Sequence, residues 1–222
     1  MINLINLFTA ISLASAFISI IFSLESHFTF ACWAIIISVI IDGLDGQLAR
    51  RYSLTSEFGK ELDSLVDVVA FGVAPSILGY IFVYRHFHLY AILSLFIYLS
   101  CSVMRLAKYN ITPKENLKVF FYGLPTTVSG GVLASFILIY RKYTQLPPPA
   151  LFLIMVLCLS FLMVSRIRYL NLDGIKQVLK KKIVLFLIIP FALILIAFPE
   201  TSIFSLFLIY LIFSPFLVRK FV

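Results

Sequence analysis

The stretch IDGLDGQLARR (Ile41–Arg51) stands at the end of a run, Phe30 to Ile41, in which no residue is charged. A second stretch, GKELDSLVDVV (Gly59–Val69), follows shortly after it. Each stretch places two aspartates beside strongly apolar sequence. A charged side chain at the centre of a membrane helix costs about 2.5–3.5 kcal/mol on insertion scales, so it is rare there and marks a functional site by default. Four carboxylates in this setting therefore bear on both the fold and the function.

The composition shows which solvent surrounds the chain. Of its 222 residues, 62% are hydrophobic and only 13% are charged, and the mean hydropathy is +1.07. Soluble domains are about one quarter charged. The apolar runs are continuous, which favours helices over the alternating strands of a β-barrel. The sequence therefore predicts an all-α, polytopic transmembrane helix bundle.

About eight spans are expected, because apolar runs approach or exceed the roughly 20 residues that cross a bilayer as a helix. They are 5–24, 28–51, 56–83, 88–108, 121–140, 148–167, 183–198 and 201–219, and the seventh is short for a full crossing. Together they form a single integral-membrane domain, 1–222.

Basic residues orient this bundle, because cytoplasmic loops carry an excess of Lys and Arg. With a cytoplasmic N-terminus, the far side holds only Arg85, Arg141 and Lys142 of the 18 Lys and Arg residues. Both termini are then cytoplasmic. The net charge of +8 is explained by this asymmetry and by attraction to anionic membrane lipid, so nucleic acid is not an expected partner.

The four aspartates are expected to meet at the cytoplasmic ends of the second and third spans. Asp42 and Asp45 are three residues apart, and Asp63 and Asp67 are four apart, so each pair shares a helix face. The short connection YSLTS (52–56) would bring the pairs together in one cytoplasmic cleft.

Four like charges in one cleft need either basic partners, which would make a structural ion-pair cluster, or bound divalent cations. Oxygen ligands favour Mg²⁺, Mn²⁺ or Ca²⁺, and two such ions could hold a diphosphate for in-line displacement. Small residues next to the aspartates, at Gly46, Ala49 and Gly59, indicate either close approach of a ligand to the backbone or tight helix packing.

The pattern of these positions resembles the signature of the CDP-alcohol phosphotransferases. The matching positions are Asp42, Asp45, Gly46, Ala49, Arg50, Gly59, Asp63 and Asp67. Members of that family transfer a phosphatidyl or similar group from a CDP-activated lipid to an alcohol and release CMP.

The resemblance implies a role for each matching position. Two divalent ions, Mg²⁺ or Mn²⁺ with Ca²⁺ possible in place of one, would be bound by Asp42, Asp45, Asp63 and Asp67. Asp67 would also be the catalytic base. The binding site for the CDP-lipid would be lined by Gly46, Ala49, Arg50 and Gly59. The N-terminal NLFT would add Asn6 and Thr9 to this site, and Ile5 stands before it where the family has a proline.

Further stretches resemble the phosphatidylserine synthase branch of the family: DSLVDVVAFGVAPS (63–76), CSVMRLAKYN (101–110) and FYGLPTT (121–127). The expected acceptor is therefore L-serine. Thr127 stands where many relatives have a second proline, and glycerol 3-phosphate or an inositol phosphate are the alternative acceptors. The likeness covers about residues 5–130, so 5–145 would form the catalytic core, with the motif at 42–67, and 146–222 would add further spans.

Three other polar residues are candidates for binding the acceptor or a phosphate. Arg105, near the inner end of the fourth span, would meet a carboxylate or phosphate, or else only reach toward the membrane surface. Asn110 begins the polar loop that follows this span, and Lys118 lies within the loop. Both are either substrate contacts or solvated loop residues.

The resulting expectation is an enzyme of a prokaryotic cell membrane whose active site faces the cytoplasm. The family resemblance also implies a homodimer. The competing class is a cation transporter that uses the same carboxylates. The clustering of all four aspartates at one end of their spans argues against it, because the far halves of those spans hold no acidic residue that would continue an ion path.

Overall fold

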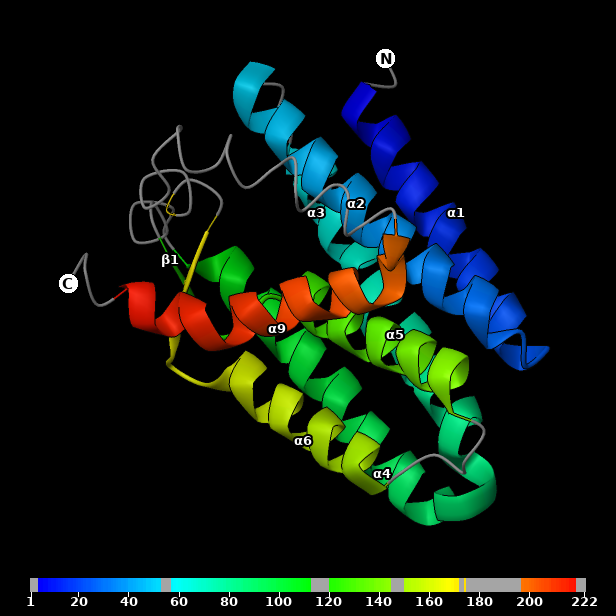
Figure 1. Cartoon of the computed structure of the whole chain (residues 1–222). Coiled ribbons are helices and arrows are strands. Elements are labelled where there is room, and N and C mark those ends of the chain that lie inside the picture. Colours follow the sequence, from blue (N-terminus) through cyan, green and yellow to red (C-terminus); the bar gives the residue numbers. More distant parts are fainter. Residues whose placement is uncertain are drawn as a thin grey trace.

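The structure is a computed structural model that describes residues 4–52, 57–112, 120–144, 150–171, 174 and 197–218. Its elements are α1 (Leu4–Leu24), α2 (Phe28–Tyr52), α3 (Glu57–Asp67), the π-helix η1 (Val68–Val73), α4 (Ala74–Ile111), β1 (Phe120–Tyr122), α5 (Thr126–Tyr143), α6 (Ala150–Val164), β2 (Arg168–Leu170) and α9 (Pro199–Val218). Figure 1 shows a bundle of helices with a small two-stranded ribbon beside α9. The predicted all-α class is confirmed.

Four described helices are long and apolar enough to cross a membrane: Asn6–Leu24, Phe28–Leu48, Glu57–Ile111 and Pro199–Val218. The chain is thus an integral membrane protein. The third of these helices contains two predicted spans, 56–83 and 88–108, while α5 and α6 correspond to 121–140 and 148–167. The predicted segment 183–198 lies almost wholly outside the described residues, so the count of eight spans stays a prediction.

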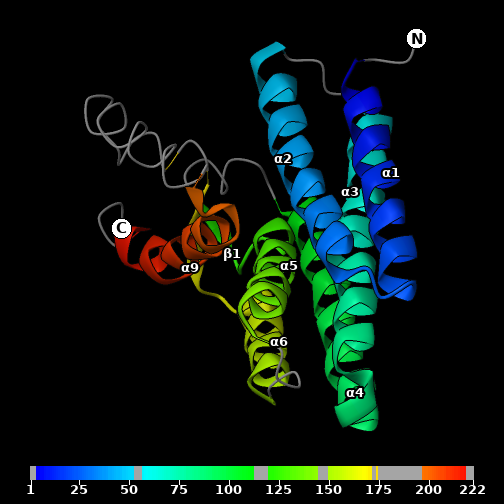
Figure 2. The ribbon, with the colours of Figure 1, turned by 45° about the vertical axis from the view of Figure 1, so that its right-hand side comes forward.

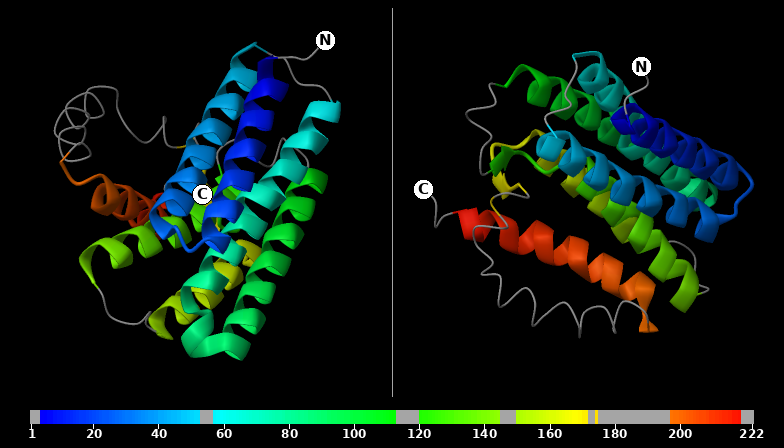
Figure 3. Two further views of the ribbon diagram at one scale, coloured as in Figure 1. Left: turned by 90° about the vertical axis from the view of Figure 1, so that its right-hand side faces the viewer. Right: turned by 90° about the horizontal axis from the view of Figure 1, so that it is seen from above.

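Serine side chains join α1 to α2. Ser15 and Ser19 on α1 donate hydrogen bonds to the carbonyl oxygens of Ala34 (2.8 Å) and Ala31 (2.9 Å) on α2. In the other direction, Ser38 donates to the carbonyl of Ser12 at 3.0 Å. Small residues that pack closely and hydrogen-bond across helices are a typical membrane interface. In Figure 3 α1 lies between α2 and the α3–α4 segment.

The long helical segment Glu57–Ile111 turns back on itself at Phe87, whose backbone is non-helical (φ −136°, ψ 37°). Contacts across the reversal are symmetric about this residue. Ser64 and Asn110, which are hydrogen-bonded to each other, each lie 23 residues from Phe87. Gly72 and Ser102, which face each other, each lie 15 residues from it. Figure 2 shows the outgoing and returning halves side by side. The reversal therefore takes one residue where the sequence predicted a break at 84–87.

A π-helix interrupts the predicted 56–83 span directly after Asp67. In η1 the backbone N–H of Ala74 donates to the carbonyl oxygen of Val69, five residues back. The Tyr98 hydroxyl donates to the Phe71 carbonyl at 2.9 Å. Short π-helical turns occur often at functional sites, and this one separates the acidic part of the helix from its apolar part.

Two short strands lie at the expected start of the fifth span and directly after the expected end of the sixth. β1 pairs antiparallel with β2, with Phe120 opposite Leu170. Next to β1, Gly123 has a φ of +78° and donates its N–H to the Ile167 carbonyl at 2.8 Å. For this reason α5 begins only at Thr126, directly after Pro125, and not at residue 121.

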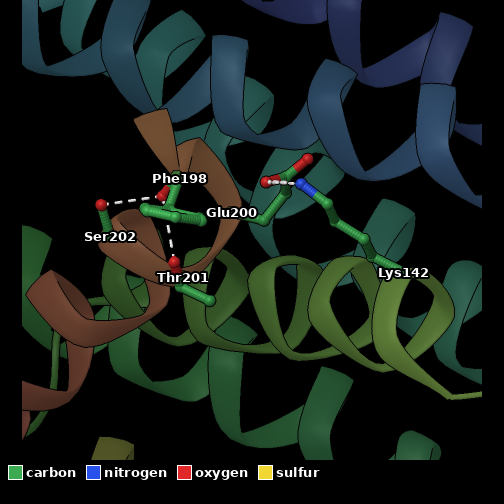
Figure 4. A network of polar contacts seen from close by, with 5 residues as sticks. All are labelled: Lys142, Phe198, Glu200, Thr201 and Ser202. Carbon is green, nitrogen blue, oxygen red and sulfur yellow. Dashed lines mark hydrogen bonds and ion pairs between the residues drawn. The ribbon is translucent and has the colours of Figure 1, made fainter. Parts of the chain in front are cut away.

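The last helix, α9, packs across α5. At one end, the ammonium group of Lys142 on α5 lies 2.7 Å from the Glu200 carboxylate of α9. Figure 4 shows this pair beside Thr201 and Ser202, whose hydroxyls bond to the Phe198 carbonyl. Further along, the ring of Phe207 fills the space over Gly131, where a Cβ atom would lie 2.2 Å from it.

Gly123→Ala is expected to lower the melting temperature of the protein in detergent. The left-handed backbone disfavours a side chain by about 1–3 kcal/mol, and the new Cβ would lie 2.1 Å from the Met163 carbonyl oxygen. Gly43→Ala is the matched control, because nothing lies within 4 Å of its Cβ position and alanine favours a helix. Equal melting temperatures for the two variants would contradict this role of Gly123.

Candidate active site

Three of the four predicted aspartates form one cluster. Carboxylate oxygens of Asp42 from α2 and of Asp63 and Asp67 from α3 all lie within 4.8 Å of one another. The spacing of four places Asp63 and Asp67 on one face of α3, and α2 adds Asp42. Oxygen ligands at such separations suit a hard divalent cation, so these residues could hold a metal ion.

Asp45 is not one of the three residues of this group, and its role as a metal ligand stays a prediction. Its side chain is buried, and it interacts electrostatically with Asp42 and Asp63. Three residues of an α-helix turn through about 300°, so Asp45 points roughly 60° away from Asp42. It therefore flanks the cluster.

Arg105 is the buried cation that faces the cluster. Only 9% of its surface is exposed, and it interacts electrostatically with both Asp67 and Asp42. The fold explains this placement, since the reversal at Phe87 brings the end of α4 back alongside α3. A buried guanidinium is tolerated where carboxylates compensate its charge.

Arg105 is held from both sides without a direct ion pair in the described part of the chain. Its Nη1 donates to Thr126 Oγ1 at 3.3 Å. The guanidinium carbon lies 5.3 Å from the centre of the Tyr109 ring and 5.9 Å from that of Phe121. A guanidinium carries five N–H donors, so donors remain for an anionic ligand between Arg105 and the aspartates.

The other two candidates for binding the acceptor are Asn110 and Lys118, and the structure describes only the first of them. Asn110 forms a reciprocal pair with Ser64 on α3, with its Nδ2 donating at 2.9 Å to Ser64 Oγ and its Oδ1 accepting at 3.2 Å. This pair fixes the end of α4 next to Asp63. Lys118 lies outside the described residues.

The residues expected to line the CDP-lipid come from three neighbouring helices. Asn6 and Thr9 are on α1, with Thr9 buried, and Gly59 is on α3. Gly46, Ala49 and Arg50 follow Asp45 on α2, where the side chains of the last two are outside the described part. Because α1 packs against both α2 and α3, the three helices that carry these positions adjoin the acidic cluster, and their role in binding the CDP-lipid stays a prediction.

Sequence reasoning missed Thr126, Tyr109 and Phe121, which hold Arg105. Two of them belong to FYGLPTT, a stretch that carried only resemblance and no assigned role. The signal available was the buried arginine itself, since a guanidinium in an apolar helix requires hydrogen-bond acceptors or aromatic faces nearby.

Comparison with known proteins assigns the family. A sequence model of the CDP-alcohol phosphatidyltransferases matches residues 2–165. The chain belongs to the CDP-alcohol phosphatidyltransferase family. The resemblance drawn from the aspartate motif is thereby confirmed. This family generally depends on divalent metal ions, in agreement with a cluster that could bind one.

Several relatives with assigned names are similar over most of the chain. The CDP-diacylglycerol–serine O-phosphatidyltransferase of Helicobacter pylori strain 26695 is 38% identical over 79% of this chain and 75% of its own length. The archaetidylserine synthase of Methanothermobacter thermautotrophicus is 33% identical over 76% and 70%. The Bacillus subtilis CDP-diacylglycerol–serine O-phosphatidyltransferase is 35% identical over 59% and 69%.

Removal of one carboxylate should weaken metal binding. Asp63→Asn is expected to lower the affinity for Mn²⁺ at least about tenfold, since even indirect supports of a metal site cost that much. Free Mn²⁺ measured by electron paramagnetic resonance during titration gives the affinity. The control is Glu61→Gln, which removes an exposed carboxylate on the same helix. An Asp63→Asn curve that overlays the wild type would show that the cluster is not the metal site.

Proposed function

We propose that this protein transfers a phosphatidyl group from a CDP-activated lipid to the hydroxyl of L-serine, forming phosphatidylserine or its ether-lipid counterpart and releasing CMP. The observation that carries the proposal is the cluster of Asp42, Asp63 and Asp67 opposite the buried Arg105. It supplies anionic groups for metal ions and a cation for a substrate anion. The names of the relatives, which specify serine, support this acceptor.

The metal requirement is proposed as two divalent ions, Mg²⁺ or Mn²⁺, with Ca²⁺ possible in place of one. The cluster and the flanking Asp45 would hold them, and the ions would neutralise the diphosphate and stabilise the CMP leaving group. The donor set fits, because it consists only of carboxylate oxygens among the described residues and hard ions prefer oxygen.

Asp67 is proposed as the general base. It accepts the proton of the serine hydroxyl while the serine oxygen bonds to the β-phosphorus of the CDP-lipid. The bond from that phosphorus to the bridging oxygen breaks, and CMP leaves with the electron pair. The proposal is supported by the place of Asp67 in the cluster and by its electrostatic interaction with Arg105, the residue proposed to bind a substrate anion. No covalent enzyme intermediate is required.

The nucleotide end of the lipid is proposed to lie along α1, α2 and α3. Gly46 and Gly59 would allow the CDP group to approach the helix backbones, and Arg50 would meet its phosphates. Asn6, Thr9 and Ala49 would complete this side. The position of these residues on helices that flank the aspartates supports the assignment.

The substrate anion at Arg105 is proposed to be the serine carboxylate or a lipid phosphate, since a guanidinium binds either in a bidentate manner. Asn110 is proposed to act indirectly, through Ser64, and Lys118 to contact substrate from the loop. The basic residues predict that this site faces the cytoplasm and that the surface attracts anionic lipid. Residues 5–145 are proposed as the catalytic core, and a homodimer as the assembly.

The acceptor is tested with purified protein, Mg²⁺ or Mn²⁺ and a CDP-lipid. CMP release is expected with L-serine and to stay at background with glycerol 3-phosphate or an inositol phosphate. Chelation of the metal should abolish it. Comparison of CDP-diacylglycerol with an ether-linked CDP-lipid identifies the chains that are accepted. Release with another acceptor and none with serine would refute the serine assignment while leaving the phosphotransferase chemistry in place.

Asp67→Asn tests the base. The amide preserves the shape of the side chain but does not accept the proton, so turnover should fall by about 10²–10⁴-fold with a much smaller change in the KM for CDP-lipid. Glu61→Gln should keep wild-type turnover. Near-normal turnover of Asp67→Asn would exclude it as the base. A burst of CMP equal to the enzyme concentration, without serine, would exclude direct transfer in favour of a covalent intermediate.

A further inference from the structure

The C-terminal helix α9 holds both backbone polar groups of one β2 residue. The hydroxyl of Tyr210 donates to the Leu170 carbonyl at 2.8 Å, and the Leu170 N–H donates to Ser214 Oγ at 2.7 Å. Tyr210 and Ser214 are four residues apart and so lie on one face of α9. Both residues lie beyond the family match, which ends at residue 165.

The ribbon held in this way reaches Arg105. Leu170 pairs with Phe120, and Tyr169 pairs with Phe121, the ring that lies 5.9 Å from the Arg105 guanidinium. Tyr169 is almost fully buried and stacks on Tyr210, with ring centres 6.0 Å apart. A path of direct contacts thus joins α9 to the guanidinium through β2 and β1.

The ribbon needs this support, because two strands of three residues each are not stable on their own. The aromatic wall on one side of Arg105 is part of the ribbon. Tyr210 also lies near enough to Arg105 to interact with it electrostatically. Loss of the bonds from α9 would therefore loosen the surroundings of the guanidinium without changing any residue that we assign to metal, base or CDP binding.

We infer that Tyr210 and Ser214 are positioning residues that hold Arg105, through β2 and β1, in place for an anionic group of a substrate. The inference rests on the proposed function. In this inference α9 takes part in substrate binding as well as in crossing the membrane. The anionic group is a carboxylate if it comes from serine and a phosphate if it comes from the CDP-lipid.

The experiment compares Tyr210→Phe and Ser214→Ala with wild type in steady-state CMP release. Each variant removes one hydroxyl and keeps the rest of the packing, so both should fold. The KM for one substrate is expected to rise about three- to tenfold, as the loss of a single hydrogen bond implies, while the KM for the other substrate changes little. A rise for serine assigns the carboxylate, and a rise for CDP-lipid assigns the phosphate.

Matched controls come from the same molecule. Ser205→Ala removes an exposed hydroxyl of α9, and Tyr90→Phe removes one from an exposed tyrosine of α4. Neither should change a KM. Ser214→Thr keeps a hydroxyl that can accept the Leu170 N–H and should restore wild-type values. Hydrogen exchange of the 168–170 amides should be faster in Ser214→Ala than in Ser205→Ala.

Unchanged KM values for both substrates in the two variants would overturn the inference while the proposed function stands. A KM change without faster exchange at 168–170 would also overturn it, because the effect would not pass through the ribbon. A wild-type protein that releases no CMP with any acceptor would instead overturn the proposed function, so the two failures are distinguishable.

Discussion

The approach of carboxylates from α2 and α3 to the guanidinium of Arg105 constrains the rest of the bundle. Three carboxylates with oxygens within 4.8 Å repel one another, and the arrangement persists only where apolar packing holds the helices or cations compensate the charge. The reversal at Phe87 supplies one cation, because it returns α4 antiparallel to α3 and places Arg105 beside Asp67. A divalent ion would supply the remaining charge.

The packing of α5 transmits this constraint to the other half of the molecule. Gly130 lets α5 approach η1 so closely that a Cβ atom there would lie 3.3 Å from Phe71 Cα. One turn earlier, Thr126 meets Arg105, and α9 packs on α5 at the next residue after Gly130, with Phe207 on Gly131. The positions of Arg105, the ribbon and α9 are thus coupled through one helix, which is why residues far apart in sequence serve one site.

The features of the structure that depend on neighbouring residues in the sequence could be predicted from it. Hydropathy located most of the helices, and helical spacing predicted that Asp63 and Asp67 share a face, which the cluster confirms. Tertiary contacts determine what was missed. The one-residue reversal at Phe87, the π-helix after Asp67 and the ribbon of Phe120 and Leu170 all depend on distant partners. The place of Asp45 beside the three clustered carboxylates, and not among them, likewise depends on how α2 packs against α3.

The central claim is that the acidic cluster holds a divalent ion against the diphosphate of a CDP-lipid. Electron–nuclear double resonance on Mn²⁺ bound to the wild-type protein with CDP-lipid tests it directly, because a phosphate oxygen on the metal couples the manganese electrons to ³¹P. The account predicts a ³¹P coupling that appears with CDP-lipid and is lost, together with the bound manganese, in Asp63→Asn. Bound Mn²⁺ without any ³¹P coupling in the presence of saturating CDP-lipid would contradict it.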